Sequence, residues 1–279
     1  MGYTSNPQPI GLTAPPGIAV LVVASEPGRA LVDVVEPLVE AGAAAILIVD
    51  DGSSQARRWV LDRITMEPTV HLLRHAKPQG RGAALKTGMQ YCAEHLRHYS
   101  GLVTTTADGQ YSAADVLRVM RALHRSPKLV ILGAREEGQR LLTVNGAVQR
   151  VTLRHRILRL LFRALTGVRL TDVQTRLRAI PIGLLPRLMK IPGAKYEYEM
   201  AMLLHIARSG YPMAEHVIFG NAEMQSPDTG FHPVADSFDM LRALLNCTPV
   251  EQDKVEDSAK RSERASKENS HRSRAKQTR

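Results

Sequence analysis

Residues 45–54 read Ala-Ile-Leu-Ile-Val-Asp-Asp-Gly-Ser-Ser. The first five are apolar and include β-branched side chains, which predicts a buried strand. Two carboxylates, a glycine and two serines follow, and such residues are typical of the turn at a strand's end. A strand without polar alternation is typical of a parallel sheet that helices cover on both faces.

The same alternation of strand and helix continues on both sides of this segment. Further apolar strands are predicted at residues 18–24, 70–74, 102–105 and 129–132. Helical spacing of apolar residues predicts helices at 29–40, 83–96, 113–123, 147–165, 196–209 and 236–245. This order predicts an α/β fold, with a Rossmann-like, mostly parallel central sheet between helices. In such sheets, ligands bind beyond the carboxyl ends of the strands.

Composition divides the chain into three expected parts. Residues 1–16 are polar and contain prolines, which predicts a flexible N-terminus, and residues 17–246 form the α/β domain. Residues 247–279 are charged and lack aromatic side chains, so we expect a disordered tail. The start lacks a signal-peptide pattern, and no run approaches the roughly 20 apolar residues of a membrane span. We expect a cytoplasmic protein, either free or attached peripherally to the cytoplasmic membrane face.

The formal net charge of +10 indicates an anionic partner: nucleic acid, an anionic membrane surface or a phosphate-bearing substrate. Aromatic residues make up 4% of the chain and no nucleic-acid motif occurs, so no nucleic-acid partner is expected. The two cysteines, Cys92 and Cys247, form no Cys-x-x-Cys pair, which argues against a zinc site. The charge alone leaves the membrane and the phosphate-bearing substrate open.

Two motifs in the first half could bind a nucleotide. Asp50 and Asp51 could accept hydrogen bonds from a base N–H and from ribose hydroxyls, although a strand ending in Asp-Gly is often a simple turn. Gly80, Arg81 and Gly82 open a predicted helix, whose first N–H groups could bind a phosphate. Leu85 precedes the lysine where a Walker A loop requires glycine, so this is not that motif. The alternative is a flexible turn with solvated basic residues.

Acidic residues in three later segments could carry chemistry. Asp108 follows a buried strand and could bind a divalent cation, since Mg²⁺ often uses one or two carboxylates plus phosphates. Asp172 lies in the segment 170–178, and Glu197 and Glu199 begin a predicted helix. For these last three residues, the alternative is helix capping and surface charge.

The order of the motifs is more specific than any one of them. Along the chain occur VDDGSS, GRGAALKTG, TADGQYS, LGAR, LTGVRLTDVQTRLRAIP, YEYEMAMLL and FHPVADS. This series resembles the family 2 glycosyltransferases. Within them it is most similar to the branch of dolichol-phosphate mannose synthases and polyprenyl-phosphate glycosyltransferases. The resemblance extends from about Ile18 to about Leu245.

The resemblance implies a GT-A fold and an inverting hexosyl transfer from a nucleotide-diphosphate sugar, with Mg²⁺ or Mn²⁺ as cofactor. It implies nucleotide contacts for the following residues: Glu26, Asp50, Asp51, Gly80, Arg81 and Gly82. It implies that Asp108 and Gln110 lie at the metal and the diphosphate. The catalytic residues that the resemblance implies are Asp108, Arg135, Asp172 and Gln174. Glu197 and Glu199 match an acidic motif on the helix that follows.

This chain departs from the family pattern at several positions near the implied site. The family's Asp-Ala-Asp-Gly is here Thr106-Ala107-Asp108-Gly109, and its Asp-x-Gln-Thr-Gly ends here in Arg176. In the family's Pro-Ala-Tyr-Asn-Glu loop only the acid, Glu26, remains. Because a hydroxyl cannot replace the charge of a carboxylate, we expect metal binding to be weakened and to depend on Asp108.

The resemblance also implies the acceptor, a polyprenyl phosphate of the dolichyl or undecaprenyl type. Arg135, Arg154 and Arg156 could hold its phosphate by charge-assisted hydrogen bonds. The basic helix predicted at 147–165 could lie on an anionic membrane or bind a membrane partner protein. A core helix with a solvated basic face explains that segment equally well. Two alternatives stay open: a soluble acceptor, and a catalytically impaired domain that binds nucleotide sugars.

Overall fold

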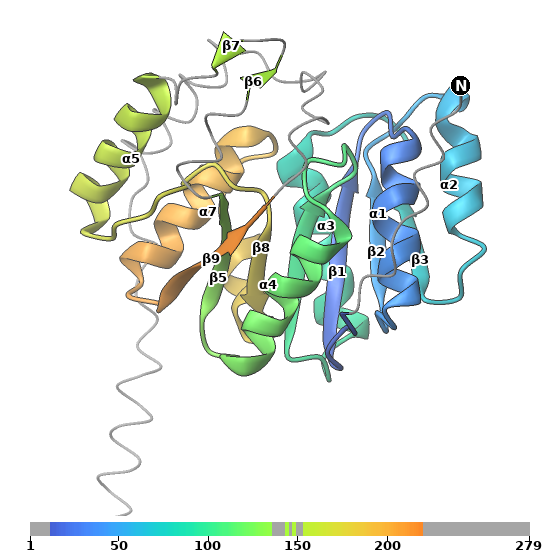
Figure 1. Ribbon diagram of the computed structural model, residues 1–279, viewed down its shortest axis with the longest axis horizontal. Coiled ribbons are helices and arrows are strands. Elements are labelled where there is room, and N and C mark those ends of the chain that lie inside the picture. The colour runs from blue at the N-terminus through green and yellow to red at the C-terminus, as the bar shows by residue number, and fades with distance from the viewer. Residues whose placement is uncertain (1–11, 136–142, 145–146, 149–152, 220–279) are drawn as a thin grey trace, which may run out of the picture. The chain divides into compact units, whose positions relative to one another are not determined.

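The computed structural model describes residues 12–135, 143–144, 147–148 and 153–219. Their centre is a seven-stranded sheet with the order β3-β2-β1-β4-β8-β5-β9 (Figure 1). The strands are β1 (Ile18–Ala24), β2 (Ile46–Asp50), β3 (Val70–Arg74), β4 (Gly101–Thr106), β5 (Val130–Arg135), β8 (Arg178–Pro181) and β9 (Met213–Ile218). β8 runs antiparallel to β4 and β5, and the other pairs are parallel. The predicted mostly parallel sheet is therefore confirmed.

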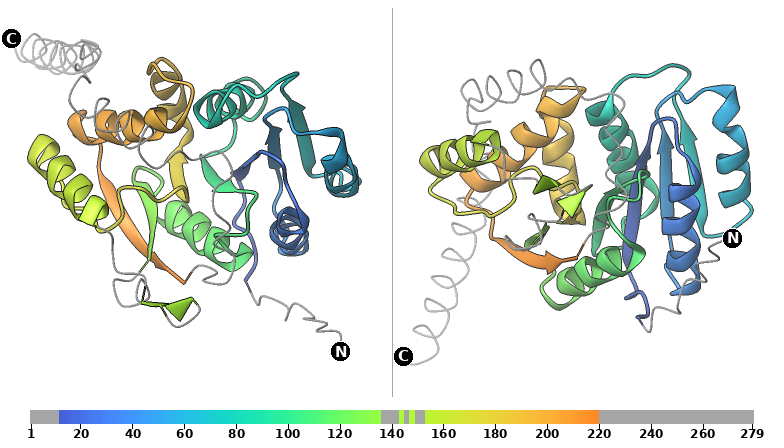
Figure 2. Two further views of the ribbon diagram at one scale, coloured as in Figure 1. Left: turned by 90° about the horizontal axis from the view of Figure 1, so that it is seen from above. Right: turned by 45° about the horizontal axis from the view of Figure 1, so that its top comes forward.

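Helices cover both faces of this sheet (Figure 2). They are α1 (Arg29–Glu40), α2 (Arg58–Ile64), α3 (Arg81–His95), α4 (Ala113–Arg125), α5 (Leu153–Thr166), α6 (Leu185–Met189) and α7 (Tyr196–Arg208). Alternate residues of β1 face opposite layers: Val20 belongs to the core cluster that includes α1, α2 and α4, whereas Leu21 belongs to the cluster that includes α3, α6 and α7. Every residue of β1 is buried, which explains its lack of polar alternation.

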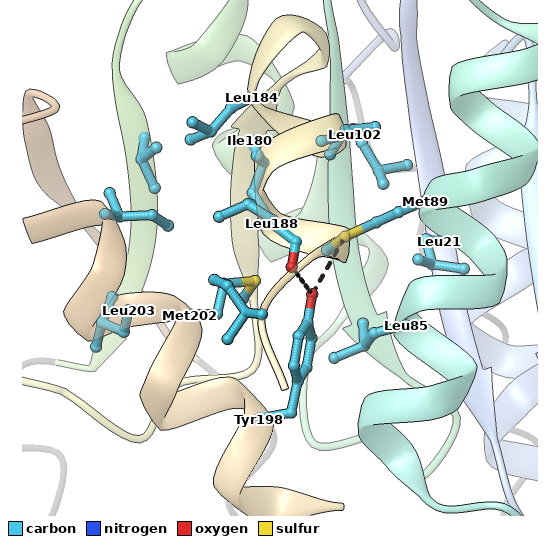
Figure 3. Close-up of a cluster of buried hydrophobic side chains, with 14 of the residues drawn as sticks. Leu21, Leu85, Met89, Leu102, Ile180, Leu184, Leu188, Tyr198, Met202 and Leu203 are labelled. Carbon is cyan, nitrogen blue, oxygen red and sulfur yellow. Dashed lines mark hydrogen bonds between the residues drawn. The ribbon is translucent and has the colours of Figure 1, made fainter. Parts of the chain in front are cut away.

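Tyr198 of α7 ties three helices together on one face (Figure 3). Its hydroxyl donates a hydrogen bond to the carbonyl oxygen of Leu188 in α6, at 3.1 Å, and lies 3.7 Å from the Met89 sulfur in α3. Burial raises the pKa of the Tyr198 phenol, so this side chain stays neutral. The contact fixes the start of α7 against α3, and both elements carry predicted site residues.

The predicted helix at 147–165 is wrong in its first part. Ala147–Val148 form the short strand β7, which pairs antiparallel with β6 (Thr143–Val144), and α5 begins at Leu153. The sequence between these two strands, Asn145-Gly146, is a residue pair typical of hairpin turns and not of a helix. The helix predicted at 236–245 and the tail 247–279 lie outside the described residues.

Part of the predicted flexible N-terminus is bonded to the domain. The Ala14 N–H donates to the carbonyl oxygen of Ala41 at 2.7 Å, and Arg121 donates to the carbonyl oxygen of Thr13. Cys92 is a buried free thiol whose pKa is raised to about 12 by burial, and Cys247 lies outside the described residues. Among the described helices, none has the length and apolar character needed to cross a bilayer.

Candidate functional site

The carboxyl ends of three neighbouring parallel strands carry most of the predicted acidic residues. In the pairing register, Ala24 of β1 is opposite Asp50 of β2, and Val23 is opposite Thr106 of β4. The three strands therefore end level with one another. Asp51 follows β2 directly and Asp108 lies two residues after the end of β4, so the carboxylates share one edge of the sheet.

Glu26 fastens the end of β1 to the turn after β2. Its N–H donates to the Ser53 hydroxyl at 2.9 Å, and its carboxylate accepts the Ser54 N–H and hydroxyl at 2.6 and 2.8 Å. The Ser54 backbone hydrogen bond, aided by the Ser54 hydroxyl and Arg57, holds the pKa of Glu26 below its usual value. The backbone at Glu26 has a φ of +49°, an unusual conformation for a residue with a side chain. Glu26 thus organises the turn.

Asp50 and Asp51 bind different parts of the chain. Asp50 is fully buried, accepts the Ser53 N–H at 3.1 Å and the Ser53 hydroxyl, and lies 3.0 Å from the Nε atom of Arg74. The Asp51 carboxylate accepts the N–H groups of Gln79 and Gly80, both at 2.8 Å. Both acids therefore hold the edge of the sheet in shape, in addition to any contact with a nucleoside.

A histidine that the sequence did not single out completes the contacts of Asp51. His75 Nδ1 donates to Asp51 at 2.7 Å, and His75 Nε2 lies 3.0 Å from the hydroxyl oxygen of Thr87 in α3. His75 and Asp51 are buried. This chain of contacts fixes the loop before α3 to the end of β2.

The glycines of the loop before α3 are needed for packing. Gly80 has a φ of +101°, and a Cβ atom there would lie 2.6 Å from the carbonyl oxygen of Ala194. A Cβ atom on Gly82 would lie 2.6 Å from Cβ of Tyr198. The Ala83 N–H also donates to Ala194, at 2.9 Å. Since the N–H groups of Gln79, Gly80 and Ala83 already have protein acceptors, phosphate binding by this loop stays a prediction.

Arg81 enters a buried charge cluster instead of extending into solvent. Its Nε atom donates to the Glu199 carboxylate at 3.0 Å, and Arg178 Nη1 donates to the Glu199 carbonyl oxygen at 3.1 Å. Burial alone would raise the pKa of Glu199, but Arg81, Arg178 and Arg176 hold it below its usual value. Glu197, by contrast, accepts the N–H groups of Ala194 and Lys195 at the start of α7.

Asp108 lies beside Arg176, which stands where the family pattern has glycine. Its Oδ1 atom accepts the Gln110 N–H at 3.0 Å and the Thr106 hydroxyl. Its Oδ2 atom lies 4.0 Å from Arg176 Nη1. The exposed fractions of the two side chains are 31% for Asp108 and 17% for Arg176, so a ligand can reach both.

The side chains around Asp108 are a poor match for the Mg²⁺ or Mn²⁺ that the resemblance implies. Among the described residues there is no group of three or more His, Cys, Asp or Glu side chains that could hold a metal ion. Asp108 supplies one carboxylate, Thr106 supplies a neutral hydroxyl, and the nearby Arg176 guanidinium repels a cation. The donor set at Asp108 therefore does not fit a divalent cation well.

Asp172 and Gln174 lie in the loop between α5 and β8, and Glu215 of β9 holds that loop. The Glu215 carboxylate accepts the N–H groups of Thr171 and Asp172 and the Thr171 hydroxyl at 2.8 to 3.0 Å. Asp172 in turn accepts the Gln174 N–H at 3.1 Å. Sequence reasoning missed Glu215, because a single acid inside an edge strand carries no motif.

The three arginines predicted for the acceptor phosphate are described unequally. Arg135 ends β5, but its side chain and that of Arg154 lie outside the described part of the structure. Arg156 is exposed on α5, next to the exposed Ile157 and near Leu160. The implied roles of all the predicted site residues stay predictions.

Comparisons with known proteins agree with this arrangement. The family model Glycosyl transferase family 2 matches residues 28–178. An undecaprenyl-phosphate mannosyltransferase from Micrococcus luteus is 30% identical over 173 residues, which cover 61% of this chain and 69% of that protein.

Two solved structures match this chain to different degrees. Glucosyl-3-phosphoglycerate synthase from Mycobacterium tuberculosis, in complex with Mg²⁺ and uridine diphosphate, has a TM-score of 0.60 at 18% identity, over 87% of this chain and 82% of that one. A mannosyltransferase from Pyrobaculum calidifontis, in complex with GDP-mannose and Mn²⁺, has a TM-score of 0.47 at 14% identity. That alignment covers 73% of this chain but spans only 55% of the mannosyltransferase.

The mostly parallel sheet with helices on both faces and the likeness to the synthase confirm the predicted GT-A fold. The family match covers more than half of the chain and includes the ends of β2 and β4, with Asp50, Asp51 and Asp108. This chain is a glycosyltransferase and belongs to glycosyl transferase family 2.

Proposed function

We propose that this protein transfers a hexose, with inversion, from a nucleotide-diphosphate sugar to a polyprenyl phosphate. The observation that carries the donor part is the level edge of β1, β2 and β4, along which Asp50, Asp51 and Asp108 lie. Ligands of open α/β sheets bind at such an edge. The family match supports a sugar donor of this class.

The proposed reaction is a single displacement at the anomeric carbon. A phosphate oxygen of the acceptor forms the new bond to that carbon, the bond to the donor's diphosphate breaks, and the nucleoside diphosphate leaves with the electron pair. A phosphate is already an anion, so the acceptor needs little help from a general base. Catalysis then rests on alignment and on neutralising the leaving group.

Protein groups carry these two tasks in the proposal. Asp172 and Gln174 align the donor sugar and the acceptor, in a loop that Glu215 holds. Arg135 is assigned to the acceptor phosphate because the resemblance implies that role. No step is assigned to Mg²⁺ or Mn²⁺, because the donor set at Asp108 does not fit such a cation well.

Two observations support a lipid acceptor at the cytoplasmic membrane face. The Micrococcus luteus relative is an undecaprenyl-phosphate enzyme. In addition, α5 exposes the apolar Ile157 and Leu160 together with Arg156 and Arg163, a combination suited to an anionic lipid surface. Because α5 packs against α7, which carries Glu199, an acceptor held at α5 would lie near the sheet edge.

A soluble acceptor is the second candidate. It is favoured by the likeness to glucosyl-3-phosphoglycerate synthase, whose acceptor is a small phosphorylated acid. The third possibility, a domain that binds nucleotide sugars without turnover, is raised by Thr106 in place of a carboxylate.

A donor screen followed by a transfer assay tests the proposal. Thermal shifts with UDP-, GDP- and dTDP-sugars should show stabilisation by one base, because a ligand that binds the folded state raises its stability. That donor is then incubated with undecaprenyl phosphate or with 3-phosphoglycerate. Transfer to the lipid supports the proposal, transfer to the acid supports the soluble acceptor, and binding without turnover supports an impaired domain. Stabilisation by none of the donors contradicts all three.

A further inference from the structure

We propose that Arg176 binds the diphosphate of the donor in place of a divalent cation, so that nucleotide binding does not require a metal. This inference rests on the proposed function, since it names the group that neutralises the diphosphate at the same site. Its first support is position. Arg176 lies two residues before β8, the antiparallel strand between β4 and β5, and therefore at the edge where β4 ends.

The backbone of Arg176 is fixed on two sides. Its N–H donates to the Tyr111 hydroxyl oxygen at 2.8 Å, and its carbonyl oxygen accepts the Thr104 hydroxyl at 3.1 Å. The hydroxyl of the preceding Thr175 donates to the carbonyl oxygen of Gly133 in β5. A side chain that starts from an anchored backbone loses less freedom when it binds a ligand.

The guanidinium itself is oriented by an aromatic ring and an acid. It lies over the ring of Tyr196, 5.2 Å from the ring centroid, and its Nη1 atom is 4.0 Å from Asp108 Oδ2. That distance exceeds a hydrogen bond, so Asp108 attracts the guanidinium without a direct bond between these two atoms. A planar guanidinium suits the paired oxygens of a phosphate.

The neighbouring arginines are less suited to this role. Arg81 is 9% exposed and bound to the Glu199 carboxylate, and Arg178 is 2% exposed and donates to the carbonyl oxygens of Thr175 and Glu199. Arg176 is 17% exposed. Of these three clustered cations, Arg176 is the one that a ligand at the sheet edge can reach most readily.

The two departures from the family pattern meet at this point in the structure. Thr106 stands where the pattern has an acid, and its hydroxyl donates to Asp108; Arg176 stands where the pattern has glycine and lies beside the same carboxylate. Thr106 removes one negative charge and Arg176 adds one positive charge, so each difference makes the net charge of the site more positive by one. Together they equal the charge of one divalent cation. One carboxylate of the family's pair is here a neutral hydroxyl, Asp108 keeps the other, and the Arg176 guanidinium supplies a positive charge directly.

Nucleotide binding by the full chain, with and without metal, tests this inference. Isothermal titration with UDP, GDP and dTDP is carried out in EDTA, in Mg²⁺ and in Mn²⁺. For the nucleotide that binds, we expect affinities in EDTA and in metal to agree within about threefold, a small difference in binding free energy. Arg176→Ala should weaken binding in EDTA on the order of tenfold or more, because a charge-assisted contact is lost.

Three further variants distinguish the loss of a specific contact in Arg176→Ala from a general loss of structure. Arg176→Lys keeps the positive charge and should retain part of the affinity in EDTA. The double variant Thr106→Asp with Arg176→Ala restores the carboxylate pair, so its binding should depend on Mg²⁺ or Mn²⁺. Arg125→Gln, at the exposed end of α4, removes an equal charge elsewhere and should bind as the unaltered protein does.

The outcomes separate this inference from the proposed function. Nucleotide binding that requires metal in the unaltered protein and is unchanged in Arg176→Ala would overturn the inference and leave the proposed function intact. If no nucleotide binds in any condition, the proposed function fails and the inference fails with it. Metal-independent binding that Arg176→Ala weakens supports both.

Discussion

Arg81 and Glu199 form a buried ion pair between the start of α3 and the first turn of α7, with 3.0 Å between Nε and Oε2. The two side chains are 9% and 7% exposed. The same glutamate accepts a hydrogen bond from Arg178 through its backbone carbonyl oxygen. One residue of α7 therefore connects the loop before α3 with the start of β8, on the side of the domain where the candidate site lies.

Glu199→Gln should destabilise the protein strongly. The substitution leaves the Arg81 guanidinium buried without its carboxylate, and breaking a buried pair in this way costs about 3–5 kcal/mol. The free energy of unfolding from urea titration measures the effect. Glu36→Gln is the matched control, because Glu36 pairs with Arg63 at 2.7 Å on the exposed surface. That change should cost less than about 1 kcal/mol. Equal losses of unfolding free energy in the two variants would show that the buried pair stabilises the fold no more than the exposed pair does.

The same pair predicts a pH dependence. The pKa of Glu199 is lowered in the folded protein, so its ionised form stabilises the fold fully above the ordinary value of 4.5. This contribution is lost as the pH falls through the lower folded pKa. Glutamine does not titrate, so the difference in unfolding free energy between the two proteins should shrink below about pH 4.5. Urea titrations at about pH 7, 5.5 and 4 would measure it. A constant difference across this range would contradict the prediction.

Glycine substitutions separate packing from backbone strain. Gly82→Ala should destabilise by about 1–3 kcal/mol, since the new Cβ would lie 2.6 Å from Cβ of Tyr198. At Gly80 an alanine would meet a similar clash and would also have to adopt a positive φ, so Gly80→Ala should lower the free energy of unfolding more. Gly42→Ala has the positive φ without a near neighbour, and Gly28→Ala has neither. Thermal unfolding should therefore rank Gly80→Ala lowest, Gly28→Ala highest and the other two between them.

The core strands were predictable because their physical signal is local. β1 is buried on both faces, and its seven apolar residues match the predicted bounds. β8 and β9 were missed for the opposite reason. β8 is four residues long, begins with Arg178 and ends with Pro181, while β9 mixes Glu215 and His216 with apolar residues. Such strands are defined by their partners in the sheet and carry no pattern of their own.

The site shows the same division. The acids at the ends of β2 and β4 were recognised because they follow apolar strands. The contact between Thr106, Asp108 and Arg176 joins segments about seventy residues apart, and a sequence shows only that each position is unusual. Arg178, fully buried in the cluster, could not be expected either, because arginines are mostly exposed.

Glu215→Gln should impair transfer more than donor binding. Glu215 accepts hydrogen bonds from three donor groups of Thr171 and Asp172 at 2.8 to 3.0 Å, and the single oxygen of an amide cannot accept them all. Under the proposed function, a loosened Asp172 lowers kcat on the order of tenfold, because small misplacements of aligning groups slow reactions strongly. Steady-state kinetics and nucleotide titration measure the two effects. Glu94→Gln, on an exposed turn of α3, is the control and should match the unaltered protein. A variant that loses donor affinity and keeps kcat would point to a different role for Glu215.

Membrane attachment through α5 makes the last prediction. Ile157 and Leu160 are 47% and 64% exposed, and Arg156 and Arg163 are exposed on the same helix. If α5 lies on lipid, replacing both apolar residues by serine should reduce flotation with anionic vesicles several-fold, since apolar burial and charge attraction both contribute. Trp59→Ser, which removes a 55% exposed apolar side chain from α2, is the matched control and should leave flotation unchanged. An equal loss of flotation in both variants would indicate nonspecific binding through any exposed apolar side chain. No binding to anionic vesicles by the unaltered protein would favour the soluble acceptor, because a polyprenyl phosphate must be reached at a membrane.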